Sequence, residues 1–126
     1  MTFDWSEYLK LAQELAGQAV GPAKEEAKLR SSVSRAYYAA FCKARNYLRD
    51  IKGDSSIPST GAAHGYVINV FKSSSDRLGR KIGDDLDRLR IRRTKVDYKD
   101  SVTGLLSIAK ISLKSAQDVI STLNII

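Results

Sequence analysis

Apolar residues recur at helical spacing throughout residues 24–52, and this long stripe constrains the fold more than any other feature of the sequence. Glu25 and Glu26 open the segment, where acidic side chains interact favourably with the helix dipole, and Gly53 ends it. The residues of the stripe are Leu29, Val33, Tyr37, Ala40, Phe41, Ala44, Leu48 and Ile51. We therefore expect one helix about 43 Å long, at 1.5 Å per residue, to form the spine of the fold.

The rest of the chain also has helical periodicity, and no segment shows the alternation of a strand. We expect further helices over residues 5–16, 62–72, 84–96 and 101–123, and a loop over the Gly-, Ser- and Pro-rich residues 53–61. The residues expected to face inward in the last helix are Val102, Leu105, Leu106, Ala109, Leu113, Ala116, Ile120 and Leu123. The sequence therefore predicts an all-α protein.

Length and composition favour one domain over residues 1–126, because 126 residues with 43% hydrophobic content suit a single core. The longest apolar run, 36–42, is far shorter than the roughly 20 residues of a membrane span, and the N-terminus has no signal segment. We expect a cytoplasmic protein that does not enter a membrane. The sequence has a single cysteine and a single histidine, which are too few to form a cluster of metal ligands. We therefore expect neither a structural metal site nor a cofactor.

Two segments carry the excess positive charge that gives a net charge of +7. Residues 24–52 contain eight basic and three acidic residues, and residues 72–99 contain ten and five. In the second segment Arg88, Arg92, Lys95 and Lys99 form one row on a helix, which makes them candidate nucleic-acid-binding residues. This charge favours a polyanion such as RNA, or an acidic protein, as partner. A basic surface that serves solubility alone is the alternative.

Arg93 interrupts an apolar stripe formed by Ile82, Leu86, Leu89 and Val96. Its guanidinium group must therefore point toward the core or an interface, where an unpaired charge is costly. Three interpretations remain open: an ion pair with Asp97 or another carboxylate, an anion-binding or catalytic role, or a side chain that extends to solvent.

The segment Ser34-Arg-Ala-Tyr-Tyr-Ala-Ala-Phe41 adds tyrosines to the long helix. Tyr37 lies in the apolar stripe, and we expect it in the core with a buried partner for its hydroxyl group. Ser34, Tyr38 and Arg45 lie on the flank of the stripe. They are candidates for contacting the 84–96 helix, the cleft of a homodimer or a bound phosphate. Tyrosine and arginine side chains serve single-stranded RNA and ordinary protein interfaces alike, so both roles stay open.

Three motifs together resemble the HEPN domain superfamily, in particular its small stand-alone prokaryotic branch. They are Asp4-Trp-x-x-Tyr-Leu9, Ser34-Arg-x-Tyr-Tyr-Ala-x-Phe41 and Leu89-Arg-x-x-Arg-x-x-x-Asp-Tyr98, and the similarity covers essentially the whole chain. This resemblance implies an up-and-down bundle of four to five helices that forms a homodimer. It also implies an Arg followed four to six residues later by a His, a pair that cleaves RNA in the dimer cleft without a metal. Many such proteins pair with a minimal nucleotidyltransferase as toxin and antitoxin.

The resemblance places the motif arginine at Arg93 and puts Tyr98 where active relatives have histidine. Tyrosine, with an ordinary pKa near 10, is a poor base at pH 7, so we expect weak or lost endoribonuclease activity. The candidate catalytic residues are Arg93, Asp97 as a proton acceptor, and Tyr98, which is also a plausible acceptor of nucleotide groups. His64 is the next candidate base, although a lone histidine near a helix start is more typical of a cap or a surface residue.

Two functions remain open. The first is an RNA-associated protein of toxin–antitoxin or defence type. The second is a non-catalytic helical homodimer that docks a nucleotidyltransferase or another protein. We expect dimer contacts mainly from the 24–52 and 84–96 helices.

Overall fold

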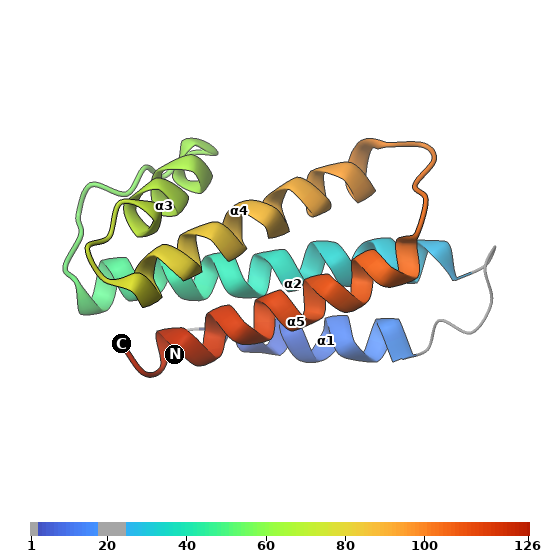
Figure 1. Ribbon diagram of the computed structural model, residues 1–126, viewed down its shortest axis with the longest axis horizontal. Helices are drawn as coiled ribbons and strands as arrows, with labels where there is room; N and C mark the ends of the chain where they lie inside the picture. The colour runs from blue at the N-terminus through green and yellow to red at the C-terminus, as the bar shows by residue number, and fades with distance from the viewer. Residues whose placement is uncertain (1–2, 18–24) are drawn as a thin grey trace.

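The computed structural model describes residues 3–17 and 25–126 (Figure 1). Their regular structure is entirely helical, without a strand, and this confirms the predicted all-α class. The elements are α1 (Ser6–Gly17), α2 (Glu26–Asn46), the π-helical turn η1 (Tyr47–Ile51), α3 (Ala62–Lys72), α4 (Arg77–Tyr98) and α5 (Leu105–Leu123).

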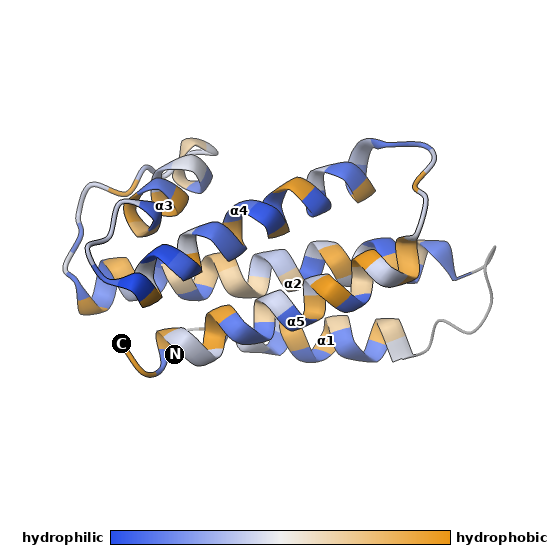
Figure 2. Ribbon diagram, viewed as in Figure 1, coloured by the Kyte–Doolittle hydropathy of each residue, from blue (hydrophilic) through white to orange (hydrophobic). Residues whose placement is uncertain are grey.

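Helix α2 lies at the centre of the bundle, in contact with α1, α4 and α5. These four helices lie alongside one another, and both ends of the chain lie at the same end of the bundle (Figure 1). The short α3 packs mainly against α4. Figure 2 shows mostly hydrophilic residues on the visible side of α4, whereas its apolar residues turn toward α2.

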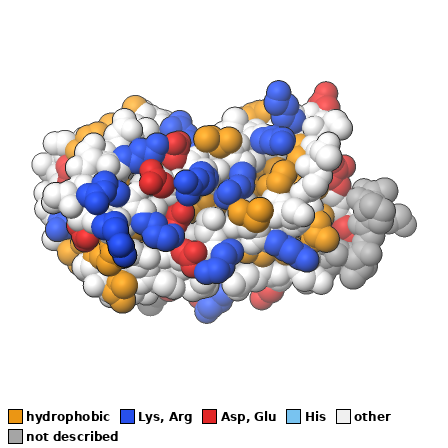
Figure 3. Space-filling view, viewed as in Figure 1, with side chains coloured by type: hydrophobic (Ala, Val, Ile, Leu, Met, Phe, Trp, Pro, Cys, Tyr) orange, Lys and Arg blue, Asp and Glu red, His pale blue; other side chains and the backbone are white. Residues whose placement is uncertain are grey.

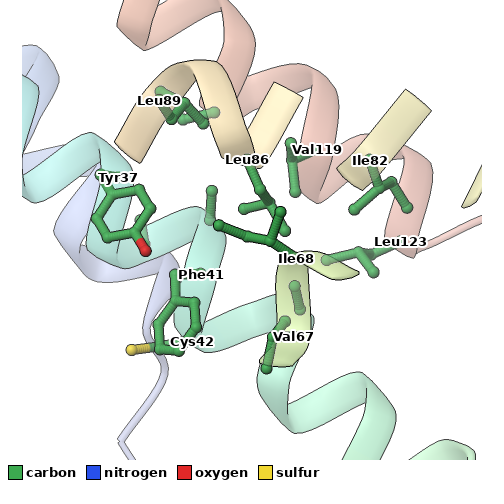
Figure 4. Packing of buried hydrophobic residues seen from close by; sticks show 14 of the residues in the cluster. Tyr37, Phe41, Cys42, Val67, Ile68, Ile82, Leu86, Leu89, Val119 and Leu123 are labelled. Atoms are coloured by element: carbon green, nitrogen blue, oxygen red, sulfur yellow. The ribbon is translucent and has the colours of Figure 1, made fainter. Parts of the chain in front are cut away.

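Every helix contributes the side chains of its inner face to the core. Tyr37, Leu86 and Leu89 have no exposed surface, and Ile68 of α3 closes the core on its side (Figure 4). Burial of large apolar side chains is the main stabilising contribution to such a bundle. The apolar stripes of α2 and α4 therefore fix how these two helices face each other.

The observed α2 differs at its C-terminal end from the helix expected over residues 24–52. The expected first residue, Lys24, lies outside the described residues. Regular α-helix stops at Asn46, and η1 continues with wider turns in which the Lys52 N–H donates to the Tyr47 carbonyl at 3.2 Å. Gly53, at φ 67°, then reverses the chain. A left-handed backbone conformation costs little free energy only for glycine, so Gly53 ends the helical segment.

Helix α4 begins at Arg77, so the expected start at Asp84 was wrong. Asp76 caps the helix by accepting a hydrogen bond from the Leu78 N–H at 3.1 Å. Gly83 lies where α3 packs very closely against α4. A Cβ atom at this position would lie 2.5 Å from the Lys72 backbone nitrogen. The glycine marks a close helix contact and not a loop.

Helix α5 begins at Leu105, four residues after the expected start at Ser101, because Gly104 adopts φ 70°. Leu106 was expected to face inward but is 51% exposed, which corrects that prediction. The buried residues of α5 are Ala109, Ser112, Ala116, Val119 and Leu123. The helix is thus rotated relative to the expected stripe.

Candidate functional site

Arg93 of α4 points across the bundle toward the tyrosines of α2. Its NH2 group donates to the Tyr38 hydroxyl at 2.8 Å, and its guanidinium carbon lies 5.1 Å from the centre of the Tyr38 ring. The Nε atom lies 2.8 Å from Asp97 Oδ2 and forms an ion pair, although its N–H is not aligned for a hydrogen bond. The side chain is only 19% exposed. The ion pair with Asp97, one of the three interpretations left open for Arg93, is therefore present, and Tyr38 contacts α4, one of the roles left open for it.

Arg30 of α2 fixes the end of α4 that carries these residues. Its NH1 group donates to the carbonyl groups of Val96 at 2.6 Å and Lys99 at 2.7 Å, and its NH2 group donates to the Asp100 carbonyl at 3.1 Å. These carbonyl groups have no partner within the helix, so a cation here satisfies them and interacts favourably with the helix dipole. Arg30 thus sets the position of Arg93 relative to α2.

His64, one turn into α3, lies among the aromatic residues of α2. Its ring stacks on Phe41, with ring centres 4.2 Å apart, and its Nδ1 atom lies 2.6 Å from the hydroxyl oxygen of Tyr37. Tyr37 is fully buried with this hydroxyl partner, as expected. The histidine is therefore a half-buried part of the aromatic cluster, which corrects its interpretation as a helix cap or a surface residue.

The second ring nitrogen of His64, Nε2, has no hydrogen-bond partner among the described residues and is not sealed from solvent. Burial lowers the pKa of His64, and the positive charges of Arg90, Arg93 and Arg45 lower it further. The imidazole is therefore neutral at pH 7. In a neutral imidazole one ring nitrogen carries a proton and the other accepts a hydrogen bond.

Two of the arginines around His64 have no carboxylate partner among the described residues. Arg90 lies one turn before Arg93 on α4, and its NH1 group is 3.8 Å from the position of a Cβ on Gly65. Arg45 of α2 donates to the Asn46 side chain and lies over the Trp5 ring at 5.7 Å. Sequence reasoning missed Arg90, although its spacing of three residues from Arg93 places both on one helix face.

An open pocket of about 600 Å³ lies beside His64. It is bordered by α2, the segment before α3 and Trp5 from the N-terminal region. Residues that bring chemistry or stacking surfaces to it are Trp5, Tyr38, Cys42, Arg45, Arg49 and His64. Burial raises the pKa of the Cys42 thiol, which keeps it protonated at pH 7. The pocket therefore offers cations, aromatic rings and the half-buried imidazole of His64.

Tyr98 does not join this group. Five residues separate it from Arg93, which is about 140° around a helix, and its side chain is 73% exposed. Ser34 lies elsewhere too: with Asp97 it lines a second hollow of about 360 Å³. Of the residues proposed from the sequence, the structure groups Arg93, Asp97, Tyr38, Arg45 and His64, and leaves Tyr98 and Ser34 apart.

The basic row follows the outer side of α4, where Lys and Arg side chains gather on the visible face (Figure 3). Arg88 lies 3.6 Å from Asp85, and Arg92 donates to the Ser115 hydroxyl at 3.5 Å. Lys95 and Lys99 are exposed and have no ion pair within residues 3–17 and 25–126. Lys95 and Lys99 are therefore directly available to an anionic partner.

No three His, Cys, Asp or Glu side chains of the described residues gather as metal ligands would. In the same part of the chain, no helix has the length and apolar character needed to cross a membrane.

The model of the HEPN domain family matches residues 7–126, which is nearly the whole chain. No curated protein and no solved structure matches it. The helical architecture agrees with the family match, and the chain belongs to the HEPN domain family.

Proposed function

We propose that this HEPN-family protein binds RNA as part of a toxin–antitoxin or defence system and that its metal-independent endoribonuclease activity is weak or lost. The observation that carries the proposal is the set of cations on α4 without carboxylate partners. Arg90, Arg92, Lys95 and Lys99 have no ion pair among the described residues. A row of unpaired cations attracts a phosphate backbone, and the counterions released on binding make the affinity depend on salt.

The row Arg88, Arg92, Lys95 and Lys99 is spaced along one side of α4, so it can follow a phosphate backbone that runs along the helix. On another part of the molecule, the pocket beside His64 offers Trp5 and Tyr38 as stacking surfaces for bases.

The test is fluorescence anisotropy with a labelled single-stranded RNA at several salt concentrations. The triple variant Arg88→Ala, Arg92→Ala and Lys95→Ala is expected to bind more weakly. If each side chain neutralises one phosphate, the slope of log K against log salt falls by about 2. The control removes the same charge elsewhere, by replacing the exposed residues Lys10, Arg35 and Lys52 with alanine. Equal loss in both triple variants would mean that net charge alone attracts the RNA.

The second candidate is a non-catalytic homodimer that docks a nucleotidyltransferase or another protein. It is favoured by two large apolar side chains on the outer side of α4, Ile91 at 63% and Tyr98 at 73% exposed. Exposed apolar groups beside cations are typical of protein interfaces. Wild-type protein that shows no RNA binding even at low salt, and sediments as a dimer, would favour this function.

A further inference from the structure

We infer that the pocket beside His64 binds the terminal phosphate group of an RNA strand, through the guanidinium groups of Arg45 and Arg49 and the Nε2–H group of His64. The inference rests on the proposed RNA binding and adds a preference for one kind of strand end. It concerns binding and not cleavage, and it uses neither Arg93 nor Tyr98.

Two arginines one helical turn apart line this pocket. Arg45 lies in α2 and Arg49 in η1, and among the described residues that line the pocket none is acidic. Like charges four residues apart on a helix repel each other. An anion bound between the two side chains removes this repulsion, because it interacts favourably with both. The pair therefore points to an anionic ligand.

Both guanidinium groups keep free N–H groups for such a ligand. Nε of Arg45 donates to the Asn46 side chain at 3.1 Å, and the guanidinium carbon lies 5.7 Å from the centre of the Trp5 ring. Nε and NH2 of Arg49 donate to Asp50 at 2.8 and 3.1 Å. The remaining groups, NH1 and NH2 of Arg45 and NH1 of Arg49, have no hydrogen-bond partner among the described residues. Guanidinium N–H groups form charge-assisted hydrogen bonds to phosphate oxygens.

The hydroxyl group of Tyr37 determines which nitrogen of His64 carries the proton. Tyr37 is fully buried, and among the described residues its hydroxyl group has one partner, Nδ1 of His64 at 2.6 Å. A buried hydroxyl hydrogen needs an acceptor, so Tyr37 donates and Nδ1 accepts. Burial and nearby arginines lower the pKa of His64, so the imidazole is neutral at pH 7 and has its single proton on Nε2. The Nε2–H group is not sealed from solvent, and it is therefore a third donor for an anion in the pocket.

The charge of a terminal phosphate group matches these donors better than the charge of an internal one. A phosphomonoester carries about −1.5 to −2 charges at pH 7 and three acceptor oxygens, whereas each phosphodiester of a strand carries about −1. Three side chains with free N–H groups line the pocket, and Arg90 of α4 adds positive charge close to His64. A phosphomonoester can therefore bind Arg45, Arg49 and His64 at the same time.

The pocket also has room for the nucleotide that carries the phosphate. Its volume of about 600 Å³ lies in the range of small-molecule sites. Trp5 and Pro58 line it with apolar surface against which a base can pack. The end of a strand, and not only an isolated phosphate ion, can therefore occupy the pocket.

The experiment measures fluorescence anisotropy of the full chain with three 2′-O-methyl RNA oligonucleotides of one sequence, each labelled at an internal position. The first carries a 5′-phosphate, the second a 3′-phosphate and the third hydroxyl groups at both ends. We expect one of the two phosphorylated strands to bind about 10-fold or more tightly than the hydroxyl-ended strand, which is the effect of one charge-assisted hydrogen bond. The tighter of the two identifies the end that the pocket accepts.

Arg45→Gln removes one charge from the pocket and should abolish this preference. Arg35→Gln is the matched control: it removes the same charge from the same helix, where the guanidinium carbon lies 5.2 Å from the centre of the Tyr8 ring, but Arg35 does not line this pocket. The control should keep the full preference, and the two variants should bind the hydroxyl-ended strand equally well. If Arg45→Gln does not fold by circular dichroism, Arg49→Gln replaces it with the same expected loss, because that side chain is 51% exposed.

The outcomes are distinct. A preference for a phosphorylated end that is lost in Arg45→Gln and kept in Arg35→Gln supports the inference. Equal binding of all three strands by the wild type overturns it and leaves the proposed RNA binding intact. It is also overturned if the preference survives in Arg45→Gln, or if both variants lose it, because net charge would then be the cause. Binding of none of the three strands would overturn the proposed function together with the inference.

Discussion

Replacing Tyr37 with phenylalanine removes one oxygen atom from the centre of the candidate site and leaves the packing of the ring intact. The side chain is fully buried, and its hydroxyl oxygen lies 2.6 Å from Nδ1 of His64. One such hydrogen bond contributes about 0.5–1.5 kcal/mol net. Water can reach part of the half-buried imidazole, which reduces the loss, so we expect unfolding to become easier by about 1 kcal/mol. For a chain of this size, Tm falls by about 3–5 °C.

Urea unfolding followed by circular dichroism measures this loss, provided that the m-value is unchanged. Tyr47→Phe is the matched control, because Tyr47 is half-buried against the same core and its hydroxyl group makes no hydrogen bond among the described residues. We expect a loss below about 0.5 kcal/mol there, since no hydrogen bond within the protein is removed. Equal losses in the two variants would refute the argument that Tyr37 and His64 form a buried, orienting pair.

Three further predictions concern the frame of the site. Gly83→Ala should destabilise the protein by about 1–3 kcal/mol in the same unfolding assay, because the new Cβ would lie 2.5 Å from the Lys72 backbone nitrogen; an unchanged midpoint would contradict this contact. Arg93→Ala should cost about 1–2 kcal/mol but leave the bundle folded by circular dichroism, since Asp97 is 26% exposed and water can replace its partner; complete unfolding would make this arginine purely structural. Burial and three arginines lower the pKa of His64, so the imidazole binds a proton more readily in the unfolded chain than in the folded protein. The free energy of unfolding should therefore keep its full value above about pH 6.5 and decline below it. In unfolding curves measured against pH, His64→Asn should remove this part of the decline, and an unchanged decline would contradict the role of His64.

The helical architecture could be predicted from the sequence because apolar spacing directly reflects burial. The stripe of α2 and the inward position of Tyr37 follow from that spacing, and the stripe is buried from Val33 to Leu48. Ile51, which was also expected on the stripe, is instead 70% exposed after the wider turns of η1. Helix ends were less predictable. In the sequence, a glycine such as Gly83 suggests a helix break, whereas in the structure Gly83 lies inside α4 and allows the close contact with α3. A glycine needed for contact and a glycine needed for a turn look the same in one sequence.

The candidate site was only half visible in the sequence. Arg93 could be found because a charge interrupted an apolar stripe. His64 was only a secondary candidate in the sequence, because its place in the aromatic cluster depends on a contact between α3 and α2 across 27 residues of chain. Tyr98 attracted attention through its spacing from Arg93, but a separation of five residues places it on another side of the helix. Spacing along one helix is thus informative, whereas the meeting of different helices needs the structure.

The most direct test of the account is nuclear magnetic resonance of the imidazole ring when RNA binds. The chain has a single histidine, so the ring signals belong to His64 without further assignment. The probe is a single-stranded 2′-O-methyl RNA, which lacks the 2′-hydroxyl group that metal-independent RNA cleavage requires and so stays intact during the measurement. If a phosphate binds among Arg45, Arg90 and the imidazole, its negative charge should raise the pKa of His64 and shift the ring signals as RNA is added. RNA that binds by anisotropy but leaves both the ring signals and the pKa of His64 unchanged would contradict the account, because the strand would then lie on the outer row of α4 alone.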